Sequence, residues 1–117
     1  MFDNDKDILT EIIKLYRDEH FMFHGIEDGG EGKRVLGIYN RGKVNPKEPD
    51  LRLYYYDEYT GYRSEREFLA LWVKESRTGR KYLIGNKDGI CYIGLINLNR
   101  FDDTEPYLTI YYVIKFN

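Results

Sequence analysis

The sequence predicts an α+β domain, mainly antiparallel β, in which an N-terminal helix packs on a twisted sheet or a partly closed barrel. Three observations predict this class: an apolar stripe of helical period near the N-terminus, short apolar runs divided by turn residues after it, and a strand–loop–strand pattern that occurs twice. The length of 117 residues suits a single domain with one hydrophobic core. Tyrosine, which favours strands, occurs 12 times.

The first predicted element is a helix over residues 5–18. Its apolar side chains recur with the period that places them on one helical face; they are Ile8, Leu9, Ile12, Ile13, Leu15 and Tyr16. Asp3, Asn4 or Asp5 could cap this helix, and acidic residues suit the positive end of its dipole. We expect the stripe to be buried against the sheet.

The strands that follow are organised by a repeat at a constant spacing of 57 residues, with units at about 33–56 and 89–113. Gly37-Ile38-Tyr39-Asn40 matches Gly94-Leu95-Ile96-Asn97, and the strand after Glu48-Pro49-Asp50 matches the strand after Glu105-Pro106-Tyr107. Each unit is a strand ending in Asn, a polar loop, and a Pro-led strand in which apolar residues alternate. We interpret the pattern as a duplication, although two similar β units could also have converged on the same turn chemistry.

Between the repeat units, a hairpin is predicted over about residues 66–85, with its turn at Arg77-Thr78-Gly79. The apolar run at 68–73 is short and continuous, as in a strand buried on both faces. Ser64 and Glu67 form a capping box, so a helix over residues 65–75 is the alternative. Asn86-Lys87-Asp88-Gly89 predicts a tight turn into the next strand.

The composition indicates in which cellular compartment the protein acts and which class of partner it binds. The lone Cys91 excludes an intramolecular disulfide, and neither a secretory signal nor a run of about 18 apolar residues is recognisable. We therefore expect a cytoplasmic protein that does not cross a membrane. The net charge of −2 argues against non-specific binding of nucleic acid, because phosphate affinity comes mainly from accumulated Lys and Arg.

No arrangement of residues predicts catalysis or a cofactor. Ser76 and Cys91 have no histidine close in sequence, so neither is recognisable as an activated nucleophile. His20 and His24 would share a face of a helix or a strand, but further ligands are missing from their neighbourhood, so we expect no metal site. The sequence thus favours a binding protein over an enzyme.

One part of the chain resembles a known family. The segments Gly37-Ile38-Tyr39-Asn40, Glu48-Pro49-Asp50 and 71–83 are similar to domain of unknown function 736 and to related small proteins of phages and plasmids. In the last segment, the shared pattern runs from Trp72 through Lys74, Ser76 and Gly79 to Tyr82. The resemblance covers about positions 37–85 and implies a mobile-element origin and a non-enzymatic accessory role. It supplies no catalytic residues.

Two groups of side chains are candidates for a contact surface: a tyrosine cluster and a set of basic residues on the central hairpin. The candidates are Tyr54, Tyr56, Tyr59 and Tyr62, with Lys74, Arg77, Arg80 and Lys81. Exposed tyrosines suit a protein interface, so we expect a protein partner, for instance a host defence component that this protein blocks. The alternative is a single-stranded nucleic acid that stacks on the rings beside the basic residues. The plainer reading is that the tyrosines are core and the charges only solvate the surface. Either a monomer or a homodimer fits the sequence.

Overall fold

The computed structural model describes residues 8–27 and 32–114, and over these residues the chain is all β with no helix. The strands are β1 (Ile8–Arg17), β2 (Phe23–Glu27), β3 (Arg34–Tyr39), β4 (Leu51–Asp57), β5 (Tyr62–Arg63), β6 (Leu69–Glu75), β7 (Lys81–Lys87), β8 (Ile90–Ile96) and β9 (Leu108–Ile114). Every pairing between them is antiparallel. The expectation of antiparallel β structure is confirmed, whereas the α+β class is wrong.

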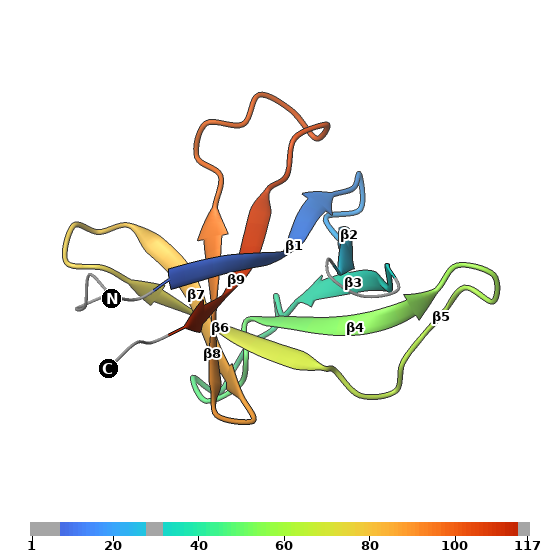
Figure 1. Cartoon of the computed structure of the whole chain (residues 1–117), viewed down its shortest axis with the longest axis horizontal. Helices are drawn as coiled ribbons and strands as arrows, with labels where there is room; N and C mark the ends of the chain where they lie inside the picture. Colours follow the sequence, from blue (N-terminus) through green and yellow to red (C-terminus); the bar gives the residue numbers. More distant parts are fainter. Residues whose placement is uncertain (1–7, 28–31, 115–117) are drawn as a thin grey trace.

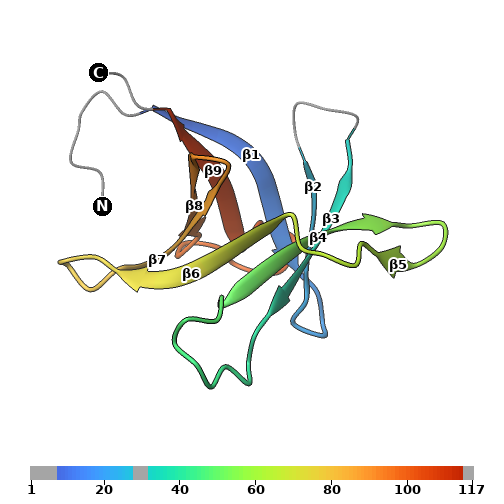
Figure 2. The ribbon, with the colours of Figure 1, turned by 90° about the horizontal axis from the view of Figure 1, so that it is seen from below.

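Eight of the nine strands close into a barrel in which each strand pairs with the next one along the chain. Closure depends on two pairings, β3 with β4 and β1 with β9. In Figure 1 and Figure 2, β1 arches from its neighbour β9 to its neighbour β2. The ninth strand, β5, lies outside this circle and pairs only with the end of β4. The predicted partly closed barrel is therefore a closed one.

The N-terminal element differs most from the prediction, because the residues expected to form a helix form β1. Ile13 and Leu15 point into the barrel while Lys14 between them is exposed, which is the alternation of a strand. The register against β9 shifts between Glu11 and Ile13, so Ile12 is the extra residue of a β-bulge. Because the extra residue interrupts the alternation of a strand, the apolar residues of this segment have a spacing in the sequence that resembles that of a helix. The residues predicted to cap the helix lie outside the described part of the chain.

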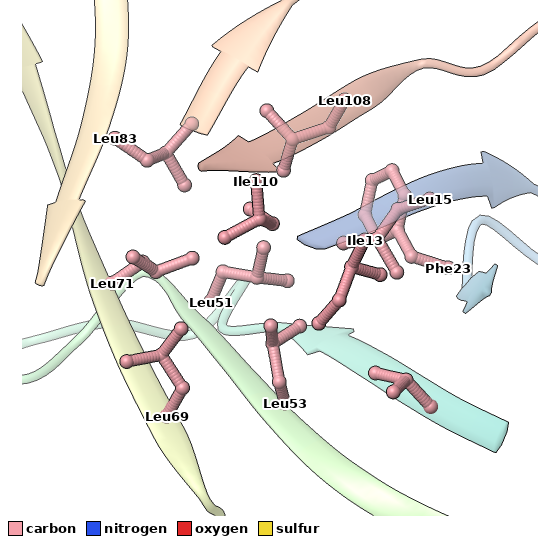
Figure 3. Packing of buried hydrophobic residues seen from close by; sticks show 11 residues of the cluster. Ile13, Leu15, Phe23, Leu51, Leu53, Leu69, Leu71, Leu83, Leu108 and Ile110 are labelled. Atoms are coloured by element: carbon pink, nitrogen blue, oxygen red, sulfur yellow. The ribbon is translucent and has the colours of Figure 1, made fainter. Parts of the chain in front are cut away.

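The barrel interior is filled by apolar side chains, as in other small closed barrels. The cluster draws on seven of the eight barrel strands and is shown in Figure 3; its members are Ile13, Leu15, Phe23, Val35, Leu51, Leu53, Leu69, Leu71, Leu83, Leu108 and Ile110. Within the described residues, no polar or charged residue is buried. Burial of each leucine contributes about 1.5–3 kcal/mol relative to an exposed side chain, so this cluster is the main source of stability.

The barrel consists of two equivalent halves, β1–β4 and β6–β9. Leu15 lies against Gly25 in one half as Leu71 lies against Gly85 in the other: a Cβ added at these glycines would meet the leucine Cδ2 at 3.1 and 3.0 Å. In the next pairs of strands, Phe23 faces Gly37 as Leu83 faces Gly94. The repeat read from the sequence is thus the second part of a four-stranded unit. Its first part escapes a search at constant spacing because the connections between these strands differ in length.

Residues 69–87 form the β6–β7 hairpin, and Leu69–Glu75 is a strand, not the helix that the capping box at Ser64 offered as an alternative. The tight turn into β8 is made by Asp88 and Gly89, which both have positive φ (53° and 78°). Within the described part of the chain, no helix is long and apolar enough to cross a membrane.

Candidate functional site

The structure separates the two groups of candidate contact residues. The end of β4 and the start of β6 lie at one end of the barrel, whereas the end of β6 and the start of β7 lie at the other. The tyrosines are therefore on the β4–β5 hairpin and the basic residues on the β6–β7 hairpin, and the two hairpins extend from opposite sides of the molecule in Figure 1. The four candidate basic residues and the candidate tyrosines therefore do not form one surface.

The four candidate tyrosines differ in their exposure. Tyr59 and Tyr62 are 94% and 77% exposed. Tyr56 is half-buried on β4. Tyr54 is only 8% exposed, and the guanidinium carbon of Arg63 lies 4.1 Å from the centre of its ring. Tyr54 is thus enclosed, which corrects its placement among the contact residues and leaves Tyr59 and Tyr62 as the outermost rings.

Hydrogen bonds within the tip of the β4–β5 hairpin fix its backbone. The Asp57 carboxylate accepts a hydrogen bond from the backbone N–H of Tyr59 at 2.9 Å, and the Asp57 carbonyl accepts one from Gly61 at 2.9 Å. Gly61 has a φ of +75°, a conformation that side chains disfavour. The backbone N–H of Tyr62 donates to Thr60 Oγ1 at 3.3 Å. The two exposed rings are therefore carried on an ordered turn.

Charges of both signs surround the hairpin. Arg34 at the start of β3 forms an ion pair with Glu58, with 2.7 Å between Nε and Oε2. Lys33 lies over the ring of Tyr55, with its Nζ 4.9 Å from the ring centre. Sequence reasoning missed Lys33 and Arg34: they are adjacent in the sequence, but only the β3–β4 pairing, in which Val35 faces Tyr55, places them beside the tyrosines.

The β6–β7 hairpin presents a positive surface. Its four candidate basic residues, which lie near the turn, are all exposed: Lys74, Arg77, Arg80 and Lys81. Ser76 holds the turn between the strands, because its carbonyl accepts from Gly79 N–H at 2.9 Å and its hydroxyl from Arg80 N–H at 3.2 Å. None of the ion pairs formed among the described residues includes these four basic side chains.

Both histidines form hydrogen bonds with Asp18 in the β1–β2 loop. His24 Nε2 lies 2.7 Å from the Asp18 carboxylate, which also accepts hydrogen bonds from the backbone N–H groups of His20 at 2.8 Å and Met22 at 3.0 Å. Burial opposes the ionisation of Asp18, but these hydrogen bonds outweigh it and lower the pKa of the carboxyl below its usual value. Among the described residues, no group of three His, Cys, Asp or Glu side chains is arranged to hold a metal ion.

Comparison with protein-family models, with curated proteins and with solved structures finds no match for this chain. The resemblance to domain of unknown function 736 therefore stays a sequence-based expectation.

Proposed function

We propose that this protein acts by binding a protein partner through the β4–β5 hairpin, and not by catalysis. The observation that carries the proposal is the exposure of Tyr59 and Tyr62 on a turn whose backbone is already ordered. Rings at these positions add nothing to the core. A tyrosine on an ordered turn offers a large contact area and loses little conformational entropy on binding.

The charges around the hairpin favour protein over nucleic acid as the partner. Binding a phosphate backbone requires an excess of basic side chains. Here Arg34 is already paired with Glu58, and Asp57 lies at the hairpin tip. In addition, β5 pairs with β4 along one edge only, so its other edge could accept a strand of the partner.

The resemblance to domain of unknown function 736 gives the proposed partner a biological class. A mobile-element protein of this kind would act in the cytoplasm of its host and bind a host protein there. A defence component that it blocks is our first expectation for the identity of that protein.

A second candidate function is the binding of single-stranded nucleic acid, which the β6–β7 hairpin favours with the four exposed basic residues near its turn. Binding there would weaken steeply with salt and would not depend on Tyr59 or Tyr62.

The test combines affinity capture from host extract with two matched variants. Tyr59→Ala/Tyr62→Ala removes the exposed rings of the hairpin, whereas Phe101→Ala removes a ring that is 95% exposed on a different loop. We expect the wild type and Phe101→Ala to retain the same partner and the double variant to lose it, with all three proteins equally folded by circular dichroism. Retention of the partner by the double variant would refute the proposal.

Capture of a labelled single-stranded DNA that is abolished by Lys74→Gln/Arg77→Gln would support the second candidate instead.

A further inference from the structure

A cavity of about 390 Å³ lies at one mouth of the barrel, where β1 ends and β2 begins. Its floor is apolar and is formed by Phe23, Leu51, Leu83 and Leu108, all labelled in Figure 3. Phe23 is equivalent to Leu83, and Leu51 to Leu108. Each half of the barrel thus contributes the same two positions to the floor, so the cavity lies between the two halves. Its volume is within the range of about 300–1,000 Å³ that is usual for small-molecule sites.

The wall of the cavity is positively charged. Arg17, Arg41 and Lys81 line it, and among the described residues of the lining none is acidic. The Phe21 ring contacts both arginines, whose guanidinium carbons lie 5.1 and 5.0 Å from the ring centre. The wall does not follow the duplication, because the position equivalent to Arg17 is Val73. The apolar floor is therefore common to the two halves of the barrel, whereas the basic residues of the wall are not repeated between them.

The loop that carries Arg41 is held in place before any ligand binds. The Asp50 carboxylate accepts hydrogen bonds from Lys43 Nζ at 3.2 Å and from the backbone N–H of Val73 at 2.8 Å. Trp72 Nε1 donates to the Lys47 carbonyl at 3.1 Å. Together these bonds tie the loop at 40–50 to β6, so the Arg41 backbone has a defined position at the mouth.

The guanidinium of Arg17 retains hydrogen-bonding capacity. Its Nε is buried and lies 3.6 Å from Asp103 Oδ1, close enough for an ion pair but too far for a hydrogen bond, and it finds no hydrogen-bond acceptor among the described residues. Because Nε is covered, a ligand in the cavity cannot reach it without rearrangement, and the exposed Arg41 and Lys81 are the basic groups that such a ligand can contact.

We propose that this mouth binds a small amphipathic anion, with its apolar or aromatic body on the floor of the cavity and its carboxylate, sulfonate or phosphate group against Arg41 and Lys81. The site is distinct from the β4–β5 hairpin and does not depend on the partner proposed for it. Charge complementarity selects an anion, and the enclosed apolar floor selects a ligand with a hydrophobic part over a free inorganic ion.

The test uses two fluorescent probes of similar shape, anionic anilinonaphthalene sulfonate and neutral phenylnaphthylamine. Arg41→Gln/Lys81→Gln removes two positive charges from the wall, and Lys74→Gln/Arg77→Gln removes two from residues that do not line the cavity. We expect the first variant to bind the anionic probe at least about tenfold more weakly, as for the loss of a charge-assisted hydrogen bond, and the neutral probe unchanged. We expect the control variant to bind both probes within about twofold of the wild type.

Methyl NMR of the wild type locates the probe. Shifts at Leu51, Leu83 and Leu108 on addition of the anionic probe would support the site, and displacement of the probe by decanoate would support an aliphatic carboxylate as ligand. Equal weakening in both variants, or shifts confined to residues outside the floor, would overturn the proposal. Capture by anionic vesicles without saturable binding of the soluble probes would also overturn it, because it would assign this face to a membrane surface.

Discussion

Asn40 and Asn97 make the same hydrogen bond in the two halves of the barrel: each side-chain amide donates to the carbonyl of the proline that precedes the next strand, Pro49 at 3.3 Å and Pro106 at 3.1 Å. Their backbone N–H groups are also equivalent, since each donates to the carbonyl of the residue after that proline, at 2.8 and 2.9 Å. The two long loops at the mouth of the barrel, at 40–50 and 97–107, are therefore held by the same pair of asparagine hydrogen bonds.

Replacing Asn40 by alanine is expected to lower the free energy of unfolding by about 1 kcal/mol, the usual contribution of one such hydrogen bond. Asn97→Ala should cost at least as much, because Asn97 Oδ1 also accepts a hydrogen bond from the backbone N–H of Asn99 at 3.2 Å. Urea denaturation of Asn40→Ala, Asn97→Ala and the double variant measures this, and the two losses should add because the sites are separate. Asn99→Ala is the control, since its side chain donates no hydrogen bond among those found in the described residues and should change stability little. An effect at only one of the two sites would contradict their equivalence.

Gly85→Ala is expected to destabilise the barrel by at least about 2 kcal/mol, as over-packing of a closed core does. A Cβ at this position would collide with the backbone carbonyl of Ala70, which cannot move without breaking the sheet. Gly42→Ala is the matched control, because an added Cβ there meets no atom within 4 Å. Thermal unfolding of the two variants measures the difference, and equal melting temperatures would show that β6 and β7 do not approach as closely as described.

The Tyr55 phenol predicts a loss of stability in alkaline solution. Burial, with a hydrogen bond to the Glu27 carboxylate, raises the pKa of Tyr55 to about 12 from its usual 10.0. The folded state therefore favours the protonated phenol, and the stability that this provides is complete below about pH 10 and is lost as the pH rises toward about 12. Tyr55→Phe has no proton to lose, so its urea midpoint should fall less than that of the wild type over this interval. An identical decline in both proteins would assign the loss to other groups.

Asp18 predicts the opposite pH dependence. Its pKa is lowered in the folded state, so its contribution to stability is present above the usual value of 3.8 and is lost as the pH falls through the lower folded-state value. Asp18→Ala leaves the amides of His20 and Met22 without their acceptor and should cost about 1–2 kcal/mol at neutral pH. The difference in urea midpoint between variant and wild type should narrow below about pH 3.8. A difference that does not change with pH would show that the carboxylate charge is not involved.

Several parts of the fold can be read from the sequence because local signals agree there with the tertiary structure. Asn40 and Asn97 end strands in both copies, and Asp88-Gly89 makes the turn that its residues favour. The N-terminal element could not be read in this way, because the bulge at Ile12 breaks the alternation that marks a strand. Its burial is decided by β9, which lies about a hundred residues later in the chain.

The candidate sites show a similar limit. A tyrosine-rich segment is visible in the sequence, but only the structure distinguishes enclosed Tyr54 from exposed Tyr59. The cavity at the mouth could not be predicted, because Arg17, Arg41 and Lys81 come from three separate segments and converge only when the barrel closes. Recognising that Gly25 and Gly85 are equivalent would have been the most useful clue, since it extends the repeat to β1 and β2.

Both functional proposals depend on a closed barrel in which β1 is a strand. The most direct test is the pattern of backbone NOEs over residues 8–17 in solution. We predict cross-strand contacts from these residues to Leu108–Ile114 on one side and to Phe23–Glu27 on the other, with slow amide exchange where the strands pair. Consecutive amide–amide NOEs typical of a helix over residues 8–17, with no contacts to β9, would contradict the account.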